Sequence, residues 1–64
     1  MRPETLWKYL KENSIRQEAV ARRSGYSVSA ISRIVNGSRY PKPYTWECIK
    51  EAVQKIMDER RGLA

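Results

Sequence analysis

Four side chains between positions 28 and 33 have the chemistry needed to read the edges of DNA base pairs: Val28, Ser29, Ser32 and Arg33. An arginine can donate two hydrogen bonds to guanine O6 and N7, and a valine can contact a thymine methyl group. Serine hydroxyls can bond base edges or phosphates. On an α-helix these positions share one side, because residues three and four apart are neighbours on its surface. A helix over residues 28–35 would therefore present all four to a major groove.

Each of these assignments has a plainer alternative at this stage. Arg33 could be a general phosphate contact or a solvated arginine. Val28 stands at the start of the expected helix, where a valine is as often a half-buried packing residue. The two serines could serve the DNA backbone instead of the bases.

Polar and basic residues on either side of this helix are candidates for holding the DNA backbone. Gln17 would begin the preceding helix, where free backbone N–H groups and the helix dipole favour a phosphate; it could also be an ordinary capping residue. Ser27 precedes the expected reading helix, and three further candidates follow it. The predicted phosphate contacts are Gln17, Ser27, Asn36, Arg39 and Lys42.

Two short helices, over 17–24 and 28–35, are required to position these side chains. Ala21, Gly25, Ile31 and Ile34 follow one another at intervals of four, six and three residues. A small residue at 21 allows close packing, and a glycine at 25 adopts the left-handed backbone of a helix end without strain. The pattern predicts a helix-turn-helix over 17–36. A two-helix packing unit with no role on DNA is the alternative.

Caps and apolar spacing define the limits of the other helices. Pro3 suits the first position of a helix that carries Leu6 and Leu10 and ends at Asn13 and Ser14. Ser27 is expected to cap the helix over 28–35, and Asn36-Gly37 to end it. Residues 38–44 are predicted to form a loop.

The fourth helix is expected to begin with Thr45 as its N-cap and to run to about Arg60. Its inward stripe would contain Trp46, Ile49, Ala52, Val53 and Ile56. Trp7 and Trp46 are interpreted as core residues. Tyr40 and Tyr44 are expected to pack around the two prolines of the preceding loop.

The positive charge is concentrated around the predicted helix-turn-helix. The chain has a net charge of +6, from 13 basic and 7 acidic residues. Residues 13–46 contain six of the basic residues and one of the acidic ones, or +5, and the remainder therefore has seven minus six, or +1. A polyanion is the natural partner of such a region. A solvated basic face that keeps a small protein soluble is the alternative.

Several classes of function are disfavoured by composition. The 64 residues include one cysteine, Cys48, and no histidine, so we expect neither a disulfide within the chain, nor a Cys/His zinc site, nor a catalytic triad. We therefore expect no enzyme activity, metal, cofactor or small-molecule ligand. The sequence also lacks the apolar run of a signal peptide or a membrane span. We expect a soluble cytoplasmic protein, in a bacterial or phage-infected cell.

The helix-turn-helix resembles the lambda-repressor-like proteins, in particular the phage Cro/CI and XRE-type transcriptional regulators. The matching residues are Gln17, Ala21, Gly25, Ser27, Ile31, Ser32, Asn36 and Gly37. The chain is also similar to the DNA-binding headpiece of LacI-type repressors, through VARRSGYSVSAISRIVNG and the later TWECIKEAVQKI. It differs from that headpiece in its additional first helix, and from the Cro/CI group in lacking a fifth helix.

The resemblance implies an all-α, compact four-helix domain over residues 1–64, with a five-helix arrangement left open. It implies that the third helix docks in the major groove of double-stranded DNA, as part of a homodimer on an inverted-repeat operator. Val28, Ser29 and Arg33 would then be base readers, and Gln17 and Asn36 phosphate contacts. We place the dimer contact on the fourth helix and the tail, around Met57 and Leu63.

The sequence thus predicts a sequence-specific transcriptional regulator, a small dimeric repressor of the Cro type. Two other functions stay open. One is an antitoxin-like or adaptor module that binds another protein through its helical surface. The other is a non-specific architectural DNA binder.

Overall fold

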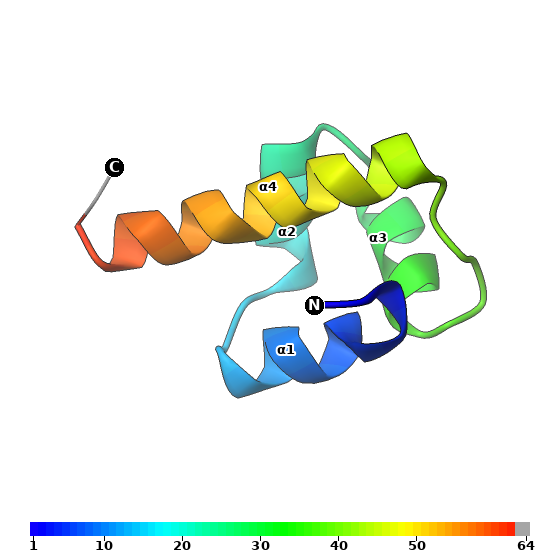
Figure 1. The fold of residues 1–64 in the computed structure, drawn as a ribbon, viewed down its shortest axis with the longest axis horizontal. Helices are drawn as coiled ribbons and strands as arrows, with labels where there is room; N and C mark the ends of the chain where they lie inside the picture. Colours follow the sequence, from blue (N-terminus) through cyan, green and yellow to red (C-terminus); the bar gives the residue numbers. More distant parts are fainter. Residues whose placement is uncertain (63–64) are drawn as a thin grey trace.

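The computed structural model describes residues 1–62 of the chain, which are all-helical as predicted. Leu63, one of the residues predicted at the dimer contact, lies outside them. A single 3-10 turn, η1 (Pro3–Thr5), leads into α1 (Leu6–Glu12). The remaining helices of this region are α2 (Gln17–Ser24), α3 (Val28–Val35) and the long α4 (Pro43–Arg60). In Figure 1, α4 crosses in front of α2 and α3, and α1 lies below it.

Local backbone chemistry defines the helix-turn-helix, and the predicted limits of both its helices are confirmed. Gly25 ends α2 in the left-handed conformation, at φ 82°, and its N–H donates to the carbonyl of Ala21 at 3.0 Å. The Ser27 hydroxyl caps α3 by accepting a hydrogen bond from the backbone N–H of Ala30 at 3.1 Å. Asn36 follows the last turn of α3, and Gly37 has the left-handed conformation, at φ 83°, directly after it.

The start of α4 was predicted three residues too late, because Thr45 was expected as its N-cap. The helix begins at Pro43, with Lys42 as an extended N-cap at φ −67° and ψ 157°. Proline suits this first position because a backbone N–H there would have no partner within the helix, so its absence costs nothing. The proline ring also favours an extended conformation for the residue before it. Thr45 lies inside the first turn, and its hydroxyl accepts a hydrogen bond from the Tyr26 hydroxyl at 3.3 Å.

One apolar core joins all four α-helices. Its members come from α1, α2, α3, α4 and the residue ahead of α2: Leu6, Leu10, Ile15, Val20, Ala21, Ile31, Ile34, Ile49, Ala52, Val53 and Ile56. No polar or charged side chain of residues 1–62 is buried. Burial of this apolar surface is the main term that holds so small a domain together.

Three aromatic assignments need correction. The side chain of Trp7 is 50% exposed and is not in the core. Leu6, the residue before it, faces the core, and the turn of about 100° between successive helical residues points Trp7 away from that direction. Tyr9 takes the inward position instead, and Trp46 packs against the core only in part. Tyr44, at 76% exposure, does not pack around the prolines as expected.

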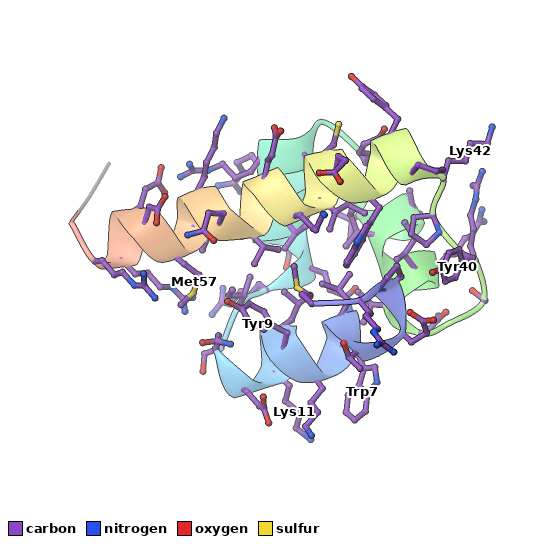
Figure 2. The ribbon with its side chains drawn as sticks, viewed as in Figure 1. Trp7, Tyr9, Lys11, Tyr40, Lys42 and Met57 are labelled. Atoms are coloured by element: carbon purple, nitrogen blue, oxygen red, sulfur yellow. The ribbon has the colours of Figure 1, made fainter. Side chains whose placement is uncertain are left out.

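The C-terminal part of α4 is attached to the rest of the fold by two arginines. The Arg60 guanidinium donates hydrogen bonds to the carbonyls of Asn13 and Ser14, which link α1 and α2. Arg23 of α2 forms a two-pronged ion pair with Glu59. Met57, on the turn before these anchors, packs against the core, and Figure 2 shows it on the side of α4 that faces Tyr9.

Within residues 1–62, no helix is long and apolar enough to cross a membrane. Cys48 is half-buried on α4.

Candidate nucleic-acid interface

The two faces of α3 differ in burial. Ile31 and Ile34 are 0% and 5% exposed and hold the helix to the core. Val28, Ser29 and Arg33 are exposed on the other face, and Val28 retains 46% of its surface. Packing against the core therefore does not account for Val28. The structure brings these three predicted base readers together on one solvent-facing side of an eight-residue helix.

Ser32 occupies a less accessible position than the other three. Its side chain is half-buried, and its carbonyl accepts the backbone N–H of Asn36 at 2.9 Å as α3 ends. Ser32 therefore lies at the edge of the exposed face of α3.

Ser27 and Asn36 already stabilise the two ends of α3. The cap made by Ser27 uses its oxygen as an acceptor, which leaves its hydroxyl hydrogen available to a phosphate oxygen. Asn36 Oδ1 accepts hydrogen bonds from Ser38, at 3.0 Å from the backbone N and 2.7 Å from the hydroxyl. The amide nitrogen of Asn36 is the group that could still donate to DNA.

Gln17 is the first residue of α2 and is half-buried. Arg16 precedes it as the N-cap, in extended conformation and without a side-chain capping bond. The backbone N–H groups of such a first turn lack partners within the helix and favour an anion. Arg16 is exposed, so a phosphate at this end of α2 would meet a cation as well as the helix dipole.

Arg39 and Lys42, from the segment that follows α3, line a pocket of about 270 Å³. Tyr26 and Thr45, whose hydroxyls bond to each other, also line this pocket. Figure 2 shows Lys42 extending outward at the edge of the molecule, where the loop from α3 meets α4. Two cations beside two hydroxyl groups form a surface suited to the DNA backbone.

The structure adds Arg22 to the candidate residues. A hollow of about 340 Å³ between α2 and the start of α3 is lined by Arg22 together with Ser27 and Val28. Sequence reasoning counted this arginine only as part of a basic region. Its position three residues ahead of Gly25, on the last turn of α2, is the signal that could have placed it beside the reading helix.

Arg23 differs from its neighbour, because its charge is compensated. The hydrogen bonds and the charge of Arg23 lower the pKa of the Glu59 carboxyl, and Glu59 raises the pKa of Arg23. The basic surface around the helix-turn-helix therefore rests on five other residues. These are Arg16, Arg22, Arg33, Arg39 and Lys42, all of them exposed.

Comparison with known families agrees with this geometry. A family model described as helix-turn-helix, of the XRE and lambda-repressor-like type, matches residues 4–47. The chain belongs to this helix-turn-helix family. The matched region includes η1 and α1 as well as the helix-turn-helix itself. Membership identifies the protein as a DNA-binding domain of the kind found in transcriptional regulators.

Matches of other kinds are lacking. Neither the curated proteins nor the solved structures contain a significant match to the chain. Residues 1–62 hold no group of three or more histidine, cysteine, aspartate or glutamate side chains that could bind a metal ion.

Proposed function

We propose that this helix-turn-helix protein is a sequence-specific transcriptional regulator that reads the major groove of double-stranded DNA with α3. The supporting observation is the division of α3 into two faces. Ile31 and Ile34 are buried, while Val28, Ser29 and Arg33 are exposed together. A helix held this way presents base-reading side chains in a fixed register, and Arg33 would pair with a guanine.

Phosphate contacts on both sides of α3 would fix the domain on the duplex. We assign Gln17 and Ser27 to one DNA strand, and Asn36, Arg39 and Lys42 to the other. Such contacts supply affinity and orientation without reading the base sequence. Because they release counterions from the DNA, their contribution to affinity weakens as the salt concentration is raised. Ser32, at the edge of the reading face, completes the set as a base contact, with a phosphate as its alternative partner.

The small size of this reading surface favours a dimer. One eight-residue helix offers few base contacts, and each good bidentate pair discriminates by about 1–3 kcal/mol. Two copies on an inverted repeat, with half-sites about one helical turn apart, would double those contacts. We therefore propose a small dimeric repressor of the phage Cro type, which acts inside the cell by occupying an operator.

Selection from a random DNA library tests this function directly. The full chain is incubated with random duplexes at about 150 mM salt, where much non-specific binding is suppressed. Enrichment of an inverted repeat with half-sites about 10 base pairs apart is expected. A single short motif would contradict the dimer, and measurable affinity without any enrichment would favour the architectural alternative.

A further inference from the structure

All three prolines of the chain line one groove on the surface. Pro3, Pro41 and Pro43 surround a hollow of about 410 Å³, together with Met1, Arg2, Tyr40 and Trp46. Its walls come from η1, from the loop after α3 and from the first turn of α4. The groove is separate from the basic pocket beside α3, although Pro41 contributes to both.

Three prolines restrict the backbone of the walls of this groove. Pro3 and Pro43 each begin a helix, and Pro41 is buried between them. The chain at Arg2 is held by the Thr5 backbone N–H, which donates to the Arg2 carbonyl at 3.1 Å. Proline has no backbone N–H and a fixed φ, so the surface is apolar and loses little freedom when a partner binds.

Aromatic side chains give the groove its capacity to hold an apolar residue. Trp46 is half-buried against the core, and Tyr40 is 68% exposed above the prolines. Figure 2 shows Tyr40 on the loop that joins α3 to α4. Grooves lined by aromatic and proline side chains are typical sites for extended peptide segments.

The charges around the groove favour an acidic partner. Arg2 lines it, and Arg39 and Lys42 flank the lining residues of the loop. The carboxylates closest along the chain are Glu4 and Glu47, and Glu47 is paired with Lys50 at 3.0 Å. A second copy of the chain would set the same cations against each other, and the apolar lining offers little to a DNA phosphate.

We infer that this groove docks an extended acidic segment of another protein, with an apolar side chain between Tyr40 and Trp46 and a carboxylate at Arg2. The site is independent of the proposed reading of DNA by α3. It gives the domain a surface through which a protein partner could be recruited.

A library of random short peptides, panned against the full chain without DNA, tests this assignment. We expect the enriched peptides to be acidic and to carry at least one large apolar residue. Tyr40→Ala should weaken their binding by about tenfold, the loss typical of an aromatic anchor, and Arg2→Glu should also weaken it. Tyr44→Ala is the matched control: its side chain is more exposed than Tyr40 and does not line the groove, so binding should not change.

Other results would overturn the assignment. Enrichment of basic or uncharged peptides, or binding that is insensitive to Tyr40→Ala, would remove the acidic segment as the occupant. Concentration-dependent self-association that Tyr40→Ala abolishes would identify a second copy instead. DNA selection on the same Tyr40→Ala protein should remain as in the wild type, so failure here is distinguishable from failure of the DNA-binding proposal.

Discussion

At the level of single residues, Arg33 and Arg39 test the proposed division between base-reading and phosphate-binding side chains. Both are exposed, on α3 and on the loop after it. We expect Arg33→Ala to weaken binding to the selected operator by about 1–3 kcal/mol and to relax the sequence preference at one position per half-site. The measurement is a binding titration against the operator and a set of single-base variants.

Arg39→Ala is the control for that experiment. Loss of a phosphate contact should weaken binding to all DNA sequences alike and reduce the slope of log affinity against log salt by about one. If Arg33→Ala behaved in this way as well, Arg33 would be a phosphate contact and the assigned reading face would be wrong.

Gly25 allows a second test at this scale, because a substitution there would strain the backbone without a side-chain clash. A Cβ at this position would meet no heavy atom within 4 Å, yet the residue has φ 82°. Gly25→Val should therefore lower the free energy of unfolding by about 1–2 kcal/mol or more, since β-branched residues tolerate left-handed backbone poorly. Thermal unfolding followed by circular dichroism measures the effect.

Gly25→Asn is the matched variant, because asparagine visits the left-handed region more readily than other side chains. It should unfold closer to the wild type than Gly25→Val does. Equal melting of the valine variant and the wild type would mean that the turn between α2 and α3 is not built on this conformation.

At the level of the elements, Ser27 combines a cap on α3 with a proposed phosphate contact, and two substitutions separate the roles. Ser27→Ala removes the bond to Ala30 and should cost about 0.5–2 kcal/mol of stability. Ser27→Asp keeps a good cap and adds a favourable charge at the helix N-terminus. It should therefore melt like the wild type while binding every DNA sequence more weakly. Unchanged affinity of Ser27→Asp would place the phosphate elsewhere.

The sequence predicted these elements where local chemistry alone decides them. Gly25, Ser27 and Gly37 each determine a helix end through their own backbone or side chain, and the limits of α2 and α3 were correct. The start of α4 was not, because Pro43 and Thr45 are both good starting residues and local preference does not choose between them. Contact of Thr45 with Tyr26, far away in sequence, belongs to the tertiary fold.

The same limit applies to the site. The spacing of residues 28–35 predicted which face of α3 is exposed, since a helix has only one side for Ile31 and Ile34 to bury. It did not place Arg22 beside Ser27, and it did not reveal that Glu59 compensates Arg23. Arg23 and Glu59 are 36 positions apart in the sequence, so their ion pair depends on where α4 packs.

At the level of the whole molecule, the Arg23–Glu59 pair joins the end of α4 to the helix-turn-helix, and it predicts a pH-dependent stability. The pKa of Glu59 is lowered in the folded state by Arg23. Its contribution is therefore fully present above the ordinary pKa of a glutamate and is lost as the pH falls through the lowered value. We expect Glu59→Gln to reduce Tm slightly at pH 7, and this difference to disappear in acid.

Glu47→Gln is the control for this pair. It removes a carboxylate from the same helix, but its partner Lys50 is one turn away on α4 and no second element is involved. Its effect on Tm should be smaller than that of Glu59→Gln. If the Glu59→Gln difference persisted at low pH, lost packing and not lost charge would be the cause.

The two-faced construction of α3 also has a consequence for how such a protein can evolve. Ile31 and Ile34 secure the fold, whereas Val28, Ser29 and Arg33 contribute little to the core. Under the proposed mode of DNA binding, mutations at the second set would change the preferred DNA sequence with almost no effect on folding. A descendant of this chain could acquire a new operator through a few substitutions in eight residues, and two duplicated copies could diverge in target while keeping the same architecture.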